Sequence, residues 1–305
     1  MSENLSVLSK AAQAEKHLDP FPYAVIRNAL PDDIFAGLSA AYPRIETIAG
    51  SGALKNNTLY LKSAREVVDN PVYPAPWRAF FAHHCSRTFY LESLNFWREE
   101  LRATHAAIEH THGKRFDDFT CGMRRLGDRD NPENRLEDIQ LDCQFGVNSP
   151  VEQVTSVRGP HVDTRYKLFA AILYFRTDGD DSSGGDLEFY RYRDPALRFR
   201  PGEPIDVGFV NRCPARALNR IEPAYVEKVT TFTYEPNTLV MWLNTPQSIH
   251  GVSPRARTRW PRRYVNFLGE SYGGKQDGFF ATKRQRGLRD LLARPHFVTR
   301  RRGTG

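Results

Sequence analysis

His161 and Asp163 stand two residues apart in the segment GPHVDTRYKLFAAILYFR. On an extended strand, side chains two residues apart leave the same face, so an imidazole nitrogen and a carboxylate oxygen point the same way. His250, which follows the apolar segment NTLVMWLN, offers a second imidazole from a different strand. Two histidines and one carboxylate on one side of a metal ion leave coordination positions open, the arrangement of catalytic iron(II) sites. We therefore predict that His161, Asp163 and His250 bind a metal and form the catalytic centre.

A His-x-Asp pair is common by chance, so the residues that follow it carry much of the prediction. They are a strand containing Tyr174, a glycine pair at Gly184 and Gly185, and arginines that precede the aromatic segment YVNFLGE. Arginine is suited to a bidentate grip on a carboxylate, and a tyrosine hydroxyl can donate a further hydrogen bond. This order of residues predicts a pocket for a dicarboxylate beside the metal.

Residues 119–270 resemble the prolyl-hydroxylase-like branch of the Fe(II)/2-oxoglutarate oxygenase superfamily in these motifs. The resemblance implies an α+β protein with a double-stranded β-helix (jelly-roll, cupin-like) core and flanking N-terminal helices. It implies Fe(II) held by His161, Asp163 and His250, with 2-oxoglutarate and O2 as cosubstrates. It also implies hydroxylation of an unactivated C–H bond in a small molecule, amino acid or peptide, or a related oxidation, with release of succinate and CO2.

The same resemblance places Tyr174 and one arginine on the 5-carboxylate of 2-oxoglutarate. Arg259 has the expected distance from His250, whereas Arg263 stands directly before the strand. Because strand register fixes where a side chain points while loop length varies, we prefer Arg263 and keep Arg259 as the alternative. Arg262 is then expected to face away from the site.

The elements that must position these residues form one domain in three parts. Residues 1–115 are expected to be mainly helical around a strand at 22–30, with two helices between 76 and 110. Residues 116–272 are expected to form the jelly-roll core, since they contain short segments rich in β-branched and aromatic residues. These segments are 119–127, 139–147, 167–176, 184–192, 228–236, 237–244 and 262–270. Residues 273–305 are a basic C-terminal extension.

The net charge of +7 comes from that extension, because residues 283–305 contain eight basic residues and one acidic residue. Nucleic acid is therefore not a favoured partner, although the spacing of Arg257 and Arg263 also occurs in nucleobase demethylases. No apolar run is long enough to cross a membrane, and we expect a cytoplasmic protein. The proline-rich loop at 193–223 is a candidate lid or homodimer contact.

The substrate itself is not readable, but Arg158, Arg165 and Arg191 are dense near the expected site and favour a carboxylate or phosphate on it. Two alternatives stay open. One is a jelly-roll metal enzyme that does not use 2-oxoglutarate, and the other is a non-catalytic ligand-binding sandwich.

Overall fold

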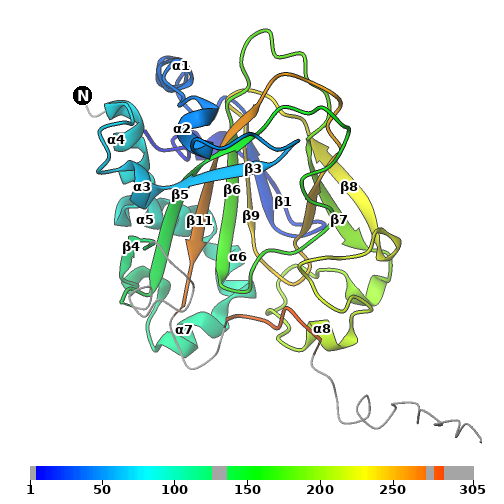
Figure 1. The fold of residues 1–305 in the computed structure, drawn as a ribbon. Coiled ribbons are helices and arrows are strands. Elements are labelled where there is room, and N and C mark those ends of the chain that lie inside the picture. The colour runs from blue at the N-terminus through cyan, green and yellow to red at the C-terminus, as the bar shows by residue number, and fades with distance from the viewer. Residues whose placement is uncertain (1–4, 126–135, 273–277, 285–305) are drawn as a thin grey trace, which may run out of the picture.

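The computed structural model describes residues 5–125, 136–272 and 278–284, and most of the basic extension lies outside these ranges. The protein is α+β. Helices cover one face of a large sheet, and a smaller sheet containing β7 and β8 lies on the other side (Figure 1). No helix within the described ranges has both the length and the apolar character needed to span a bilayer.

The large sheet is antiparallel apart from one short parallel strand at its side. Its order is β1 (Glu15–His17), β2 (Tyr23–Ile26), β9 (Leu239–Leu243), β6 (Lys167–Tyr174), β11 (Arg262–Glu270), β5 (Ile139–Asn148) and β3 (Leu59–Ser63), with β4 (Cys121–Met123) parallel to β5. The small sheet has the order β10 (Ile249–Val252), β7 (Leu187–Tyr192) and β8 (Val226–Phe232). The seven strand segments predicted for the core and the strand predicted at 22–30 are therefore all found, while β1, β3 and β10 were not predicted.

The helices pack against the large sheet through aromatic side chains. They are α1 (Asp32–Ala40), α2 (Ile45–Ala49), α3 (Ala64–Val67), α4 (Ala75–His84), α5 (Arg87–Phe96), α6 (Arg98–Thr104) and α7 (Ala106–His112). Trp77 of α4 lies 4.6 Å from Phe145 of β5, measured between ring centroids. The prediction of two helices over 76–110 is wrong. The chain breaks into four, because Ser86 caps α5 and buried Trp97 and His105 stand at the next two helix junctions.

Alternation along β5 separates the helix-facing core from the inner face of the sheet. Leu141, Cys143 and Phe145 belong to the core beneath the helices, whereas Gln144 lines a cavity on the opposite face. The same rule holds for β11, where Val265 and Phe267 join the helix-side core. Polar side chains therefore collect between the two sheets.

The proline-rich stretch 193–223 is more ordered than the loop expected from the sequence. It contains the short helix α8 (Phe209–Arg212) and builds a small core of its own. Buried members of that core include Leu197, Phe209, Val210, Leu218 and Ile221. These apolar contacts hold the stretch against β10 and the segment that carries Val162.

Candidate metal centre and its cavity

His161, Asp163 and His250 come together between the two sheets. One ligand atom from each residue can be chosen so that all three lie within 4.8 Å of one another. His161 and His250 face each other in an antiparallel bridge, in which each backbone N–H donates to the other's carbonyl at 2.9 Å. Because Asp163 is two residues further on, its carboxylate joins them, with Oδ2 3.7 Å from Nε2 of His250.

Backbone carbonyls orient both imidazole rings. Nδ1 of His161 lies 2.9 Å from the Gly159 carbonyl, and Nδ1 of His250 lies 3.0 Å from the Ser248 carbonyl. A carbonyl can only accept, so each Nδ1 carries the proton and each Nε2 keeps its lone pair for a ligand. The two rings are thus held in the tautomer that metal binding requires.

The protonation states also suit a cation. Burial lowers the pKa of His161 well below its usual value, and the neighbouring His250 lowers it further. Burial likewise lowers the pKa of His250. Burial alone would raise the pKa of Asp163, but chiefly the positive charge of Lys167, 3.2 Å away, brings it well below its ordinary value. Two neutral imidazoles and one ionised carboxylate are the donor forms that bind a divalent metal.

A cavity of about 530 Å³ extends from the three side chains across the inner face of the large sheet. Gln144 of β5 and Arg262, Tyr264 and Asn266 of β11 line it, together with Trp242. At its outer edge lie Leu59 and Leu61 of β3, which are both exposed. The cavity is therefore wide enough for a small ligand and open towards β3.

Arg262 is the buried cation of this cavity. Its side chain is only 2% exposed, and its guanidinium lies among the rings of Tyr174, Tyr234 and Tyr264 at 4.9 to 5.3 Å. Nη2 donates to the Tyr174 hydroxyl at 3.1 Å, whereas Nε is buried without a partner. In the described part of the chain, no carboxylate forms an ion pair with it. A buried arginine in this state is prepared to receive an anionic ligand.

The expected orientation of the neighbouring arginines is wrong. Arg263 points to the helix side, where Nε donates to the Phe175 carbonyl at 3.1 Å and the guanidinium covers the Tyr42 ring at 4.8 Å. Arg259 is exposed and stacks on Trp260. The reason is the pleat of β11, since Arg263 shares its face with Val265 and Phe267 and Arg262 shares its face with Tyr264 and Asn266.

Tyr174 lies behind Arg262 and is fully buried. It does not line the cavity, so its hydroxyl meets the guanidinium and not the open space. Burial raises the pKa of Tyr174 despite the opposing effect of Arg262, and the hydroxyl stays protonated. Tyr174 is therefore placed to hold Arg262 in position.

The three arginines expected near the substrate separate into two groups. Arg158 and Arg165 line a second pocket that also includes Asp163. Arg191 lies elsewhere, on β7, where Nε contacts Glu227 Oε1 at 2.7 Å and Nη1 lies 3.6 Å from Asp19. The expectation that Arg191 stands at the site mouth is thus wrong, because two carboxylates already hold its guanidinium.

Comparisons with known proteins found similarity at the level of structure only. No family model matches the chain, and no curated protein matches it in sequence. A prolyl-4-hydroxylase from Pseudomonas putida aligns with a TM-score of 0.39 and 12% identity, over 81% of this chain and 92% of that one. A prolyl 4-hydroxylase from Phytophthora capsici aligns with a TM-score of 0.44 and 11% identity, over 96% and 73%. A 2OG-Fe(II) oxygenase family oxidoreductase from Burkholderia pseudomallei gives 0.38 and 12%, over 92% and 95%.

The chain is similar in structure to prolyl-4-hydroxylases and 2OG-Fe(II) oxygenases.

Residues that sequence reasoning missed include Arg262, Gln144 and Asn266, which line the cavity, and Arg255, which lies behind it. Arg255 is 1% exposed and donates to the Ser149 and Trp260 carbonyls at 3.2 and 2.7 Å. The alternation Tyr264, Asn266 against Val265, Phe267 was the available signal for Arg262. Arg255 had no local sequence signal, since its contact with Gly185, where a Cβ would lie 2.5 Å from Arg255 Cγ, comes from the tertiary structure.

Proposed function

We propose that the protein is an Fe(II)- and 2-oxoglutarate-dependent dioxygenase that hydroxylates a C–H bond of a small-molecule, amino-acid or peptide substrate. The observation that carries the proposal is the pairing of two features in one cavity. A His-Asp-His group lies in it, and it is lined by a buried arginine that has no carboxylate partner within the described ranges. A dicarboxylate that chelates a metal at one end needs a cation of this kind for its far carboxylate.

The side chains fit these roles by their chemistry. His161, Asp163 and His250 would hold the iron, since both Nε2 atoms are free of protons and the carboxylate is ionised. When bound, iron(II) supplies activation of O2 for attack on the C–H bond, with conversion of 2-oxoglutarate to succinate and CO2.

The rest of the cavity binds and orients the cosubstrate. Arg262 would grip the far carboxylate of 2-oxoglutarate, and Tyr174 would keep the guanidinium aimed into the cavity. The apolar faces of Ile172, Trp242 and Leu268 would limit water around the bound cosubstrate. Arg263 and Arg259 have no part in this assignment, because neither lines the cavity.

The chain topology supports a jelly-roll core for residues 116–272 within a single domain. β5, β11, β6 and β9 are neighbours in the large sheet, and β10, β7 and β8 form the opposing one. The His161 segment bridges to β10 and so extends the small sheet by one position. We infer a double-stranded β-helix from this strand order, with the metal ligands between the two sheets.

Anaerobic spectroscopy tests the proposal. Iron(II)-loaded protein is titrated with 2-oxoglutarate, and the visible charge-transfer absorption of an iron(II)–2-oxoglutarate chelate is followed. We expect the band in the wild type and its loss in His161→Ala. Arg262→Gln should retain iron while its apparent Kd for 2-oxoglutarate rises about 30-fold or more, as for loss of a charged hydrogen-bonding partner.

Arg263→Gln is the matched control, because the same charge is removed one residue away on the other face of β11. Its band and affinity should equal those of the wild type. Stoichiometric iron without any band would indicate a metal enzyme that does not use 2-oxoglutarate. Failure to bind iron at all would overturn the proposal in favour of a non-catalytic sandwich.

A further inference from the structure

Lys167 places a cation in direct contact with the candidate metal centre. It is the first residue of β6, it lines the same cavity as the three candidate ligands, and its side chain is mostly buried. Its Nζ lies 3.2 Å from Oδ2 of Asp163, and the same oxygen lies 3.7 Å from Nε2 of His250. An ion bound by Asp163 and His250 would therefore share this carboxylate with an ammonium group.

The backbone of Lys167 is fixed by three neighbours. Its N–H donates to the Thr164 carbonyl at 3.1 Å, and its carbonyl accepts from Nδ2 of Asn244 at 3.2 Å. In the large sheet it pairs with Glu270 of β11. These contacts keep the start of the side chain beside the metal centre, so that the ammonium group meets Asp163 inside the cavity.

Asp163 is the only acid in ion-pair contact with Lys167 in the part of the chain that the structure describes. Glu270 lies opposite Lys167 in the sheet, but other groups hold its carboxylate. Nε of Arg124 lies 3.2 Å from Oε2 of Glu270, and the Tyr272 hydroxyl donates to the same oxygen at 2.5 Å. A metal ion at the candidate centre and the ammonium of Lys167 therefore depend on one carboxylate.

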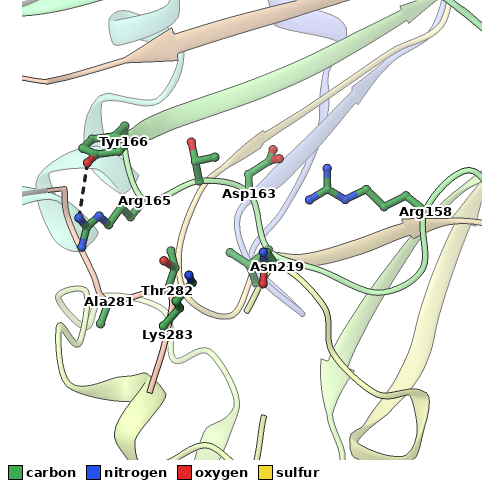
Figure 2. A pocket seen from close by; sticks show the side chains of 10 residues that line it. Arg158, Asp163, Arg165, Tyr166, Asn219, Ala281, Thr282 and Lys283 are labelled. Atoms are coloured by element: carbon green, nitrogen blue, oxygen red, sulfur yellow. Dashed lines mark hydrogen bonds between the residues drawn. The ribbon is translucent and has the colours of Figure 1, made fainter. Parts of the chain in front are cut away.

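The two arginines on this loop do not replace Lys167 as the partner of Asp163. Figure 2 shows the Arg165 guanidinium turned to Tyr166, whose hydroxyl accepts from Nη2 at 3.4 Å. Arg158 lies on the other side of Asp163 and is exposed to solvent, which screens its charge (Figure 2). Among the lysines and arginines that the structure describes, Lys167 alone is in ion-pair contact with Asp163.

The charge of Lys167 has opposite effects on a metal and on an anion in this cavity. A divalent cation is repelled by an ammonium that holds the same carboxylate, whereas a dianion such as 2-oxoglutarate is attracted by it. Bulk solvent screens neither effect strongly, because the side chains of Lys167 and Asp163 are only 15% and 11% exposed. Loss of the charge should therefore shift the two affinities in opposite directions.

We propose that Lys167 belongs to the functional site, where its charge weakens binding of the metal and strengthens binding of an anionic ligand of that metal. In the metal-free protein it compensates the buried charge of Asp163. Once a metal shares that carboxylate, the anion compensates the ammonium. The proposal rests on the proposed function in taking His161, Asp163 and His250 as the metal ligands.

Isothermal titration calorimetry with Mn(II) in place of Fe(II) tests the proposal at constant ionic strength. The Kd of Mn(II) is measured without any anion, and the Kd of 2-oxoglutarate and of oxalate is measured for the Mn(II)-loaded protein. Lys167→Met removes the charge and keeps an unbranched side chain. We expect its Kd for Mn(II) to fall about tenfold and its Kd for both anions to rise about tenfold. Lys167→Arg retains the charge and should keep all three values close to those of the wild type.

Lys62→Met is the matched control. Lys62 also pairs with a carboxylate four residues away, that of Glu66 at 3.0 Å, but it does not line the cavity. All three Kd values should equal those of the wild type in this variant. Circular dichroism of each variant checks that it is folded.

The direction of the two shifts decides the outcome. A higher Kd for Mn(II) in Lys167→Met would overturn the proposal, because Lys167 would then only support Asp163 as a ligand. Unchanged values in Lys167→Met would overturn it as well. Oxalate separates this test from that of the proposed function: a wild type that binds Mn(II) and oxalate but not 2-oxoglutarate would contradict the proposed function, while opposite shifts in Lys167→Met would still support the role of Lys167.

Discussion

At the scale of single residues, the pair Arg262 and Tyr174 places a positive charge in the interior of the protein. Arg262 is 2% exposed and has no carboxylate partner among the described residues, so burying its charge costs free energy that the Tyr174 hydroxyl offsets only in part. An anionic ligand bound to Arg262 would compensate this buried charge. Tyr174 therefore acts on ligand affinity through Arg262, as a positioning residue.

Tyr174→Phe should raise the Kd for 2-oxoglutarate about three- to tenfold while iron binding stays unchanged, because the hydrogen bond that positions the Arg262 guanidinium contributes roughly 1 kcal/mol. The anaerobic titration of the absorption band measures this. Tyr190→Phe removes a hydroxyl that donates to Glu188 outside the cavity and should leave the Kd unchanged. An unaltered Kd in Tyr174→Phe would show that Arg262 keeps its position without the hydroxyl.

The buried side chain of His105 should make the stability of the fold depend on pH. Burial lowers the pKa of His105 from 6.5 to about 4, although the bond to the Asn244 carbonyl opposes this. The unfolded chain takes up a proton below pH 6.5 while the folded protein does not, so the stability present above pH 6.5 is lost as the pH falls towards 4. The loss amounts to about 3 kcal/mol at most.

Urea unfolding of the wild type and of His105→Gln between pH 7 and pH 4 measures that contribution. The free energy of unfolding of the variant should fall less steeply with decreasing pH. His110→Gln is the control, because His110 lies near the end of α7 and is not buried in the core. Parallel curves for His105→Gln and the wild type would mean that His105 does not supply this proton linkage.

At the scale of elements, the turn before β7 allows two buried arginines to lie side by side. Gly185 has a φ of +74°, and a Cβ there would lie 2.5 Å from Arg255 Cγ and 3.4 Å from Arg262 Cδ. Gly185→Ala should therefore lower the free energy of unfolding by about 2–4 kcal/mol and weaken 2-oxoglutarate binding.

Gly179→Ala is matched to this change, since its φ is +80° but no atom lies within 4 Å of an added Cβ. Gly179→Ala introduces the backbone strain without a steric clash. We expect its free energy of unfolding to fall by about 1 kcal/mol and its 2-oxoglutarate binding to equal that of the wild type. Urea denaturation measures both variants. If both variants lost the same free energy of unfolding, Gly185 would not be required for the packing of Arg255 and Arg262.

At the scale of the whole molecule, the candidate metal centre joins the large sheet to the small one. His161 and Asp163 precede β6 of the large sheet, whereas His250 belongs to β10 of the small one. A bound ion links both sheets and is lost on unfolding. Its binding free energy therefore adds to global stability.

Iron(II) at 100 times its Kd should stabilise the folded protein by about 2.7 kcal/mol, with a matching rise in Tm under anaerobic conditions. Excess chelator should return the Tm to that of the metal-free protein. His161→Ala should show no metal-dependent rise, whereas Arg262→Gln should show the full rise. A rise that persists in His161→Ala would place the stabilising ion elsewhere.

Local patterns in the sequence were enough to predict every strand except β1, β3 and β10, and the same-face pair His161 and Asp163. Side-chain alternation has a period of two residues, so parity along one strand can be read directly from the chain. The same parity in Tyr264, Val265, Asn266 and Phe267 separates Arg262 from Arg263. It does not say which face meets the metal, because helices bury one face of β11 and the small sheet covers the other.

Only the tertiary structure decided the features that depend on distant segments. The pairing of Tyr264 with Tyr174 brings Arg262 to the Tyr174 hydroxyl, 88 residues apart in sequence. The approach of Leu218 and Phe279 to the segment that carries His161 depends on backbone hydrogen bonds to Val162 and Arg165, which no local pattern encodes. Spacing along one element follows from backbone geometry, whereas the approach of two elements follows from the packing of the whole core.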